Sequence, residues 1–312
     1  MLDLHRLRLL RELSYRDTIA AVADALAYTP SAVSQQLAIL EREAGVPLLE
    51  RTGRRVRLTP AARTLVAHAE EILARMEGAE AVLAQARANV TGTLRIGAFP
   101  SAARVILPGA LVELGRDCPD LDLMVEEFDP ALAAEALRTG TLDAALTQDY
   151  DLVPEPEHPA LEARVVLAEP MYVASRGAPH DPDDPVGSFR DDWWIMGKPG
   201  NVCRLAAERI CQAAGFQPRV RHQSDDFPTA LALVAAGQGQ AIMPRLGTVH
   251  APDGVLLTAL PHAARVAVTC RRGGSTHPAI AAFQHAVSHA VQDYRRDVAK
   301  GANDRSPRRS SS

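Results

Sequence analysis

The segment TPSAVSQQLAILERE, residues 29–43, carries side chains that can contact DNA from a helix. Thr29 can cap the free amides of this helix, and Pro30 follows at the first helical position, where its missing N–H is harmless. Short hydroxyl and amide side chains occupy the side opposite the apolar stripe. Because Ser and Gln reach base edges and phosphates while bulky residues hold the backbone away, this side suits the major groove. The predicted DNA contacts in this segment are Thr29, Pro30, Ser31, Ser34, Gln35 and Gln36.

The same helix also has a purely structural explanation. Its apolar residues recur at positions 0, +4, +7 and +11, which marks the side that a protein core would cover. A polar surface opposite that stripe needs no ligand, so the helix alone leaves both interpretations open. The stripe consists of Val33, Leu37, Leu40 and Ala44.

The next segment, VPLLERTGRRVRLTP, favours the DNA interpretation. It predicts two short strands, residues 48–51 and 56–59, joined by a turn that contains Gly53. Helices are predicted upstream in DLHRLRLLREL and TIAAVADALAY, so three helices and a hairpin together predict a winged helix-turn-helix. Arginines on such a wing contact phosphates or the minor groove. The predicted contacts in the wing are Arg51, Arg54 and Arg55.

Charge is distributed unevenly along the chain. The 312 residues carry a net charge of −4, which argues against a wholly basic nucleic-acid coat. Residues 1–66 nevertheless hold ten arginines against seven acidic residues, a net charge of +3. The cationic part of the chain therefore coincides with the predicted DNA-binding segment.

Three further stretches, at the end of a predicted strand or the start of a predicted helix, contain residues that can hold a small molecule. Ligands in open α/β folds bind beyond the carboxyl ends of strands. Amides at a helix start suit a carboxylate, whereas an aspartate suits a cation or a hydroxyl. Each stretch, considered singly, is also explained as a helix cap or a turn. The candidate contacts are Ser101 and Ala102 in FPSAAR, Thr147 and Asp149 in LTQD, and Gly200 and Asn201 in KPGNVCR.

Other reactive residues form no recognisable catalytic or metal site in the sequence. His285 and His289 stand four residues apart, but no third ligand is evident, so a solvated helix side is expected. The four cysteines form no CxxC pair, and no nucleophile, base and oxyanion site assembles, so we expect no enzyme, no cofactor and no metal. The N-terminus lacks the apolar run of a signal peptide, and no window reaches a membrane-spanning length, so we expect a cytoplasmic protein without membrane contact.

A long helix is predicted after the wing. It starts with Thr59 and Pro60, and its apolar residues repeat in heptads. A lone helix keeps such a seam only when something covers it, either the same helix of a second chain or a later domain of its own chain. We predict a dimerisation helix. The two rows are Ala62, Ala69, Met76, Leu83 and Val90, and Leu65, Ile72, Ala79 and Ala86.

Beyond Val90, strands alternate with helices, which predicts the α/β class with parallel strands and two lobes. The chain would cross between the lobes near residues 167–170 and 262–267 and leave a cleft between them. The predicted division is a winged helix-turn-helix domain at 1–59, a linker helix at 60–91, an effector-binding domain at 92–297, and a disordered tail at 298–312. Within the effector-binding domain, lobe I spans 92–167 and 267–297, and lobe II spans 168–266.

The stretch AVADALAYTPSAVSQQLAILEREAGVPLLERTGRRVRLTPAA resembles the DNA-binding segment of the LysR-type transcriptional regulators. Leu49 stands where that family usually has Phe, Ala62 where it usually has Gly, and Asp17 where Gly or Ser is frequent; none of these departures removes a DNA-facing polar group. The α/β part resembles the effector-binding region of the same regulators, whose fold is similar to periplasmic solute-binding proteins. The resemblance implies a homodimer or homotetramer that binds promoter DNA and a small-molecule effector and contacts RNA polymerase.

The leading hypothesis is therefore a ligand-responsive transcription regulator, in which occupancy of the cleft alters lobe closure and the placement of paired DNA-binding domains. The effector would be a small molecule, with a carboxylate favoured by the helix starts. The alternative is a cytoplasmic solute-binding or catalytic α/β protein whose N-terminal region serves only assembly. Specific binding to promoter DNA distinguishes the two.

Overall fold

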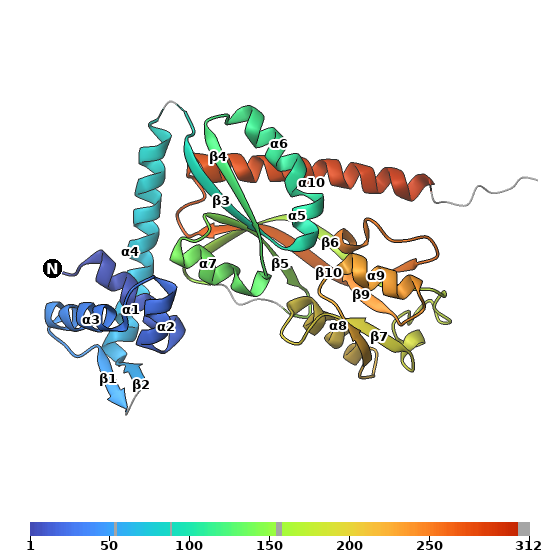
Figure 1. Cartoon of the computed structure of the whole chain (residues 1–312), viewed down its shortest axis with the longest axis horizontal. Coiled ribbons are helices and arrows are strands. Elements are labelled where there is room, and N and C mark those ends of the chain that lie inside the picture. Colours follow the sequence, from blue (N-terminus) through green and yellow to red (C-terminus); the bar gives the residue numbers. More distant parts are fainter. Residues whose placement is uncertain (53–54, 88, 154–157, 305–312) are drawn as a thin grey trace, which may run out of the picture.

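The computed structural model describes the chain except residues 53–54, 88, 154–157 and 305–312. A helical domain and an α/β domain are joined by one long helix (Figure 1). The order of elements in the first part confirms the predicted winged helix-turn-helix. These elements are α1 (Leu4–Arg16), α2 (Ile19–Ala25), α3 (Pro30–Ala44), β1 (Leu49–Thr52), β2 (Arg55–Leu58) and the long helix α4 (Pro60–Gln85).

Threonine side chains determine where three of these helices begin. Thr18, Thr29 and Thr59 each accept a hydrogen bond from the backbone N–H three residues later. Each cap satisfies one of the amides that the first turn of a helix leaves free. Behind the caps, Leu37 and Leu40 of α3 are buried in a core shared with α1 and α2, so this side of α3 faces inward as predicted.

The long helix α4 has two different surroundings along its length. Ala62 and Ala69 are fully buried against the helical domain, whereas the side chains of Met76 and Leu83 are 41% and 69% exposed. The helix ends at Gln85, so the predicted continuation of the heptads to Val90 is wrong. Ala86 is the C-cap of the helix, and three residues later the sequence NVTG, residues 89–92, contains Asn, β-branched residues and Gly, all of which have lower helix propensity than the alanines and leucines of the helix.

A six-stranded mixed sheet forms the centre of the α/β domain. β3 runs parallel to β4 and β5, while β10 runs antiparallel to β5 and β6, and β6 antiparallel to β9. The parallel arrangement expected from the alternating pattern is therefore only partly present, because β6 and β10 carry the chain to lobe II and back. In spatial order the strands are β4 (Leu121–Glu127), β3 (Gly92–Ala98), β5 (Ala144–Tyr150), β10 (Leu256–Arg271), β6 (Leu161–Ser175) and β9 (Ala241–Pro244).

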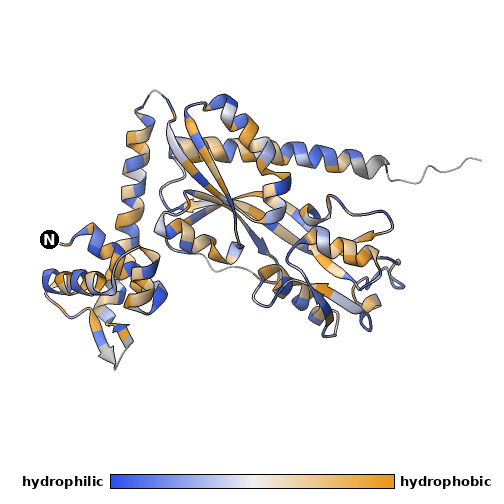
Figure 2. Cartoon of the chain, viewed as in Figure 1, coloured by the Kyte–Doolittle hydropathy of each residue, from blue (hydrophilic) through white to orange (hydrophobic). Residues whose placement is uncertain are grey.

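Helices and a second, two-stranded sheet complete the two lobes. Hydrophobic residues concentrate in the central strands, and β5 becomes hydrophilic toward its end (Figure 2). Lobe I contains α5 (Pro100–Val105), α6 (Leu107–Asp117), η1 (Pro130–Leu132), α7 (Ala133–Thr139) and α10 (Pro278–Asp304). Lobe II contains η2 (Gly187–Phe189), β7 (Trp193–Met196), α8 (Val202–Ala213), β8 (Arg219–Gln223), α9 (Phe227–Ala235) and η3 (Arg245–Thr248).

Two long strands connect the lobes. The predicted crossings near 167–170 and 262–267 fall inside β6 and β10, which pair with each other along most of their length. Their register shifts between Ala259 and Ala263, next to the crossing. Separate cores lie on either side, one around Phe283 in lobe I and one around Trp194 in lobe II.

The last helix, α10, is longer than expected. It continues to Asp304, so the start of the disordered tail predicted at residue 298 is wrong, and residues 305–312 lie outside the described part of the chain. Val298 packs against the core of lobe I, which gives the helix a reason to continue past the predicted boundary. In the described part of the chain, no helix combines the length and apolar character that crossing a membrane requires.

Candidate DNA interface and effector cavity

The outer side of α3 presents a short polar surface. Pro30, Ser31 and Gln35 are exposed, and Ala38 continues the same side. In Figure 1, α3 lies on the side of the helical domain that faces away from the α/β domain, and the β1–β2 hairpin projects from the lower end of the helical domain. Because the exposed side chains are small or flexible, the backbone of this helix can enter a major groove.

Some of the predicted DNA contacts in α3 already form hydrogen bonds within the protein. The Thr29 hydroxyl caps the helix and lies 3.1 Å from the hydroxyl of Ser31, and Ser34 is half-buried. The Gln36 side chain accepts a hydrogen bond of 2.9 Å from Arg6 Nε of α1. Arg6 also forms an ion pair with Glu43 of α3 through Nη1. Gln36 is therefore tied to α1, and Arg6 adds a cation beside α3 that sequence reasoning did not single out.

The predicted wing arginines are only partly described. Arg54 lies outside the described residues, and for Arg51 and Arg55 only the backbone is described, in β1 and β2. The register pairs Arg51 with Val56 and Thr52 with Arg55, as an antiparallel hairpin requires.

A small cavity lies between the two lobes and contains Ser101 and Asn201 from the predicted set. We call it the effector cavity; its free volume is about 60 Å³. Ser101 and Gln148 are only 3% and 7% exposed. Nevertheless, Ser101 Oγ and Gln148 Nε2 have no hydrogen-bond partner among the described residues. The lining residues are Phe99, Pro100, Ser101, Asp129, Pro130, Gln148, Tyr150, Asn201, Val202, Cys203, Asp225 and Phe227.

Thr147 and Asp149 do not join this cavity, so their predicted convergence with Ser101 is wrong. Successive side chains of a strand point to opposite faces, and the face of β5 that turns toward the effector cavity carries Gln148 and Tyr150. Thr147 and Asp149 line a larger outer cavity of about 540 Å³, where Thr147 bonds Thr269 at 2.6 Å. The Asp149 carboxylate there pairs with Arg265 Nε at 2.9 Å.

The other predicted ligand residues have structural positions next to the cavity. Ala102 is fully buried in the core of lobe I and does not line the cavity, although it follows Ser101. Asn201 caps α8 by accepting a hydrogen bond from Arg204 N at 3.1 Å. Gly200 adopts a φ of +92°, which favours glycine, and it is exposed outside the cavity lining.

Sequence reasoning identified only Ser101 and Asn201 among the lining residues and missed the others, of which Gln148, Tyr150 and Cys203 bear polar groups in contact. Gln148 and Tyr150 follow buried Leu146 at alternate positions, so the strand period could have identified them once Leu146 was placed in the core. The Tyr150 hydroxyl donates to Gln148 Oε1 at 2.9 Å, and burial raises its pKa well above the usual value. Burial also raises the pKa of Cys203 to about 11, against the opposing effect of its hydrogen bond with Tyr150.

The walls of the effector cavity come from both lobes. Ser101 lies in the first turn of α5 in lobe I, whereas Cys203 and Phe227 belong to α8 and α9 of lobe II. Beside the cavity, Arg104 of α5 and Asp226, the cap of α9, form an ion pair of 3.4 Å between the lobes. A ligand in this position contacts both lobes at once and can therefore sense their separation.

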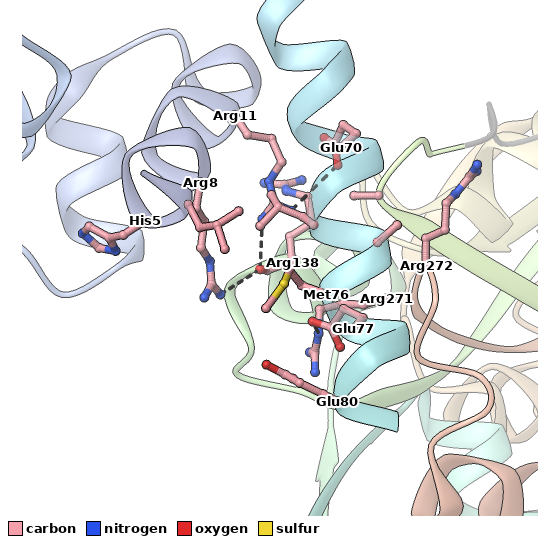
Figure 3. A pocket seen from close by; sticks show the side chains of 14 residues that line it. His5, Arg8, Arg11, Glu70, Met76, Glu77, Glu80, Arg138, Arg271 and Arg272 are labelled. Carbon is pink, nitrogen blue, oxygen red and sulfur yellow. Dashed lines mark hydrogen bonds and ion pairs between the residues drawn. The ribbon is translucent and has the colours of Figure 1, made fainter. Parts of the chain in front are cut away.

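A third, interdomain cavity of about 270 Å³ lies between the helical domain, α4 and lobe I (Figure 3). Arg8 and Arg11 extend from α1 and donate hydrogen bonds to the backbone carbonyl of Arg138 at the end of α7. Glu12 is fully buried and accepts hydrogen bonds from the guanidinium groups of Arg11, Arg16 and Arg138. These contacts tie the helical domain to lobe I.

The α4 side of the same junction is also closely fitted. Arg271 Nε, at the end of β10, lies 2.6 Å from Glu77 of α4. At Gly273, where φ is +89°, an added Cβ would lie 2.1 Å from the carbonyl oxygen of Ala74. Only glycine fits this approach, so the turn after β10 lies directly against the long helix.

Comparison with known proteins agrees with both domains. A family model described as a bacterial regulatory helix-turn-helix protein of the lysR family matches residues 4–63, and one described as a LysR substrate binding domain matches residues 87–292. A probable hydrogen peroxide-inducible genes activator of Streptomyces viridosporus is 31% identical over 234 residues, covering 74% of this chain and 73% of that protein.

Solved structures share the arrangement at lower sequence identity. A Corynebacterium glutamicum OxyR C206 mutant has a TM-score of 0.57 and 23% identity, covering 97% of this chain and 95% of that one. Full-length CbnR complexed with its target DNA has a TM-score of 0.51 and 22% identity, covering 93% and 100%. With both family models matched in sequence order, the chain belongs to the LysR family and is a ligand-responsive, DNA-binding transcriptional regulator.

Proposed function

We propose that this regulator reads promoter DNA through the exposed side of α3 and binds a small carboxylate-bearing effector in the effector cavity. The main support for the effector is the pair of buried polar atoms at one cavity, Ser101 Oγ and Gln148 Nε2, without partners among the described residues. Buried polar groups are almost always hydrogen-bonded, and both atoms can donate to a carboxylate. An effector shifts promoter binding only if it binds the open and closed lobes unequally.

The size of the cavity adds a condition. Its free volume of about 60 Å³ is well below the roughly 300–1,000 Å³ of ordinary ligand pockets. An effector of metabolite size therefore requires the lobes to separate, which lengthens the Arg104–Asp226 ion pair between them. Binding and lobe movement are thus coupled in this proposal.

Replacing Ser101 by alanine is expected to weaken effector binding about tenfold, the value of one hydrogen bond to a charged group. Calorimetry of the full-length protein against a panel of carboxylate metabolites identifies the effector, and the same titration then measures the variant. Thr147→Ala, on the opposite face of β5, is the matched control and should bind like the wild type. Equal affinity in wild type and Ser101→Ala would remove Ser101 from the site.

For the DNA side, Gln35→Ala is expected to weaken binding to the specific promoter about tenfold while leaving binding to random DNA unchanged, because an amide reads base edges and adds little to the charge attraction. Gel-shift assays at physiological salt with the upstream intergenic DNA and a scrambled duplex measure both. Gln212→Ala, another exposed glutamine, on α8, serves as the control. A loss of equal size on both duplexes would contradict base reading by Gln35.

The proposal includes a homodimer or homotetramer that works in the cytoplasm beside RNA polymerase. Its support is the row Ile72, Met76, Ala79 and Leu83, which α4 exposes at heptad spacing beyond the part that packs on its own domain. Two paired recognition helices match a two-fold promoter site. Sedimentation of the full-length chain tests the association, and a monomer at high concentration would contradict it.

A peroxide-sensing or catalytic function has weaker support. The Streptomyces viridosporus relative is named as a probable activator of genes inducible by hydrogen peroxide. A thiol reacts with peroxide as the thiolate, but burial raises the pKa of Cys203 to about 11 and that of Cys211 to about 12, so little thiolate is present near neutral pH. Among the residues that the structure describes, no base is hydrogen-bonded to Ser101 Oγ. We therefore propose effector binding without chemistry.

A further inference from the structure

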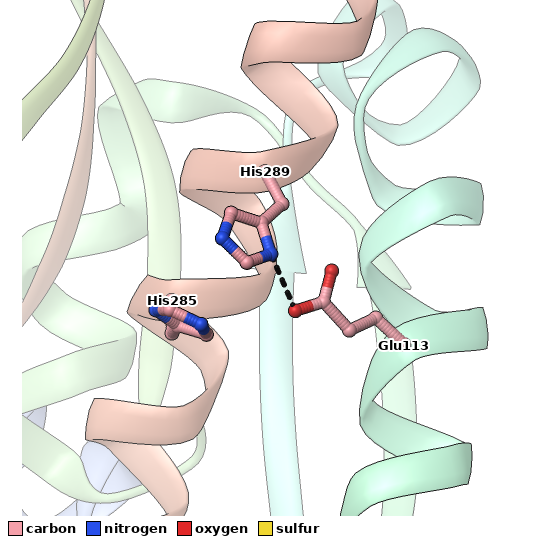
Figure 4. Close-up of side chains that lie close together, drawn as sticks. All are labelled: Glu113, His285 and His289. Atoms are coloured by element: carbon pink, nitrogen blue, oxygen red, sulfur yellow. Dashed lines mark hydrogen bonds and ion pairs between the residues drawn. The ribbon is translucent and has the colours of Figure 1, made fainter.

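Glu113, His285 and His289 lie together on the outside of lobe I, where α6 and α10 pack against each other (Figure 4). The two helices approach closely: an added Cβ at Gly109 would meet the Cβ of Ala290 at 3.4 Å. One turn beyond Gly109, Glu113 therefore faces His289, which follows His285 by one turn of α10. The close helix contact thus supplies the third group that the sequence alone did not reveal.

The distances among these side chains are short. The three residues offer one ligand atom each, all within 4.8 Å of one another. His289 Nδ1 lies 2.8 Å from a carboxylate oxygen of Glu113, and the two imidazole rings have centroids 4.1 Å apart. Both histidines are exposed and Glu113 is half-buried, so an ion can reach the group directly from solvent.

We propose that Glu113, His285 and His289 bind one Zn²⁺ ion or a similar borderline transition metal. Two imidazole nitrogens and a carboxylate oxygen are a donor set that zinc uses, with water in the fourth position, whereas Mg²⁺ and Ca²⁺ prefer oxygen ligands only. Ligand atoms around tetrahedral zinc are about 3.3 Å apart, so small side-chain rotations bring the three groups to the ion. Binding of the ion replaces the hydrogen bond between His289 and Glu113.

A hydrogen bond between His289 and Glu113 does not by itself account for the whole group. It leaves His285 without a hydrogen-bond partner among the described residues, although its ring stacks edgewise against His289. A metal ion uses all three side chains and joins α6 to α10. The expected consequence is a lobe I whose thermal stability depends on the metal, since an ion that binds only the folded state stabilises it by mass action.

The test uses the untagged, full-length protein stripped of metal with a chelator. Titration with Zn²⁺ in competition with a chromophoric chelator is expected to show one site per chain that depends on these residues. His285→Ala and His289→Ala should each weaken binding at least about tenfold, and Glu113→Gln should weaken it as well. Zn²⁺ at a hundredfold excess over the wild-type Kd should raise the Tm of the wild type by roughly 5 °C or more and raise that of each variant by about half as much or less.

Two controls separate this site from other zinc ligands. His180→Ala removes an exposed histidine far from the group in sequence and should bind like the wild type. Co²⁺ should give the absorption bands of a nitrogen- and oxygen-ligated ion in the wild type and lose them in His289→Ala. The proposal is overturned if the wild type takes up no Zn²⁺, or if all three variants bind it as the wild type does. Because the replaced histidines are exposed, we expect the variants to remain folded, and circular dichroism measures this.

Discussion

Replacing Glu12 by glutamine is expected to lower the free energy of unfolding by about 3 kcal/mol or more, the usual effect of removing one partner from a buried ion network. Glu12 is fully buried and holds the guanidinium groups of Arg11, Arg16 and Arg138. Burial raises the pKa of the Glu12 carboxyl, but the hydrogen bonds and charges of Arg138 and Arg11 outweigh it and place the pKa below its usual value. A neutral amide would leave these cations without their common anion.

Urea unfolding of the full-length protein near pH 7 measures this loss, with Glu71→Gln on the exposed side of α4 as the control. The stabilisation by Glu12 depends on pH in a definite direction. Because the folded-state pKa of Glu12 is lowered, its stabilisation is present above the unfolded-state pKa and is lost as the pH falls through the folded-state pKa. The difference between wild type and Glu12→Gln should therefore shrink in acid. A difference below about 1 kcal/mol at pH 7 would show that the arginines find other partners.

The second large effect concerns Glu169, in β6 at the crossing between the lobes. Its carboxylate accepts hydrogen bonds from Leu246 N at 3.0 Å and from the Tyr294 hydroxyl at 3.1 Å, so it joins η3 of lobe II to α10 of lobe I. Burial raises its pKa from 4.5 to about 7, although these hydrogen bonds and the charge of Arg245 oppose the shift. The folded protein therefore holds a proton on Glu169 under conditions where the unfolded chain has released it.

The stability contributed by this group is fully present below the unfolded-state pKa and is lost as the pH rises through about 7. Glu169→Gln keeps an acceptor for Leu246 N, and its amide N–H can donate to the Tyr294 oxygen in place of the present hydrogen bond, but it does not ionise. Relative to the wild type, the variant should gain about 2–3 kcal/mol of unfolding free energy between pH 5 and pH 8. Denaturation series at both pH values measure the gain, and Glu126→Gln, at an exposed position of β4, should show none. A constant difference at both pH values would mean that Glu169 titrates normally.

The DNA-binding half was predictable because its signals are local. The caps at Thr18, Thr29 and Thr59 and the buried stripe of α3 depend on residues within one or two helical turns. The end of α4 was not predictable from the heptad count, since that count follows apolar positions and ignores the low helix propensity of the sequence NVTG at residues 89–92. The hydrogen bond between Gln36 and Arg6 joins two helices, and no pattern in the sequence of either helix indicates it.

The candidate sites depend on contacts between distant segments. Ser101 was predictable because it follows a strand and opens a helix. To choose between Thr147 and Gln148, one must know which face of β5 turns toward the effector cavity, and that depends on the elements that cover each face. Likewise, His285 and His289 were visible at helical spacing, while Glu113 lies far earlier in the chain and comes near only through the packing of α6 on α10.

The paired strands β6 and β10 also determine how this protein can respond mechanically. They are hydrogen-bonded to each other in both lobes, so neither lobe swings on a loose joint. The two strands form a ribbon within the six-stranded sheet, in which neighbouring strands are already twisted relative to each other, and a change in that twist keeps their hydrogen bonds. The effector should therefore act as a torque that winds or unwinds this ribbon, with the compliance concentrated where pairing lapses between Ala259 and Ala263. We expect a rotation there to reach the helical domain through lobe I, whose Arg138 and Arg271 contact α1 and α4.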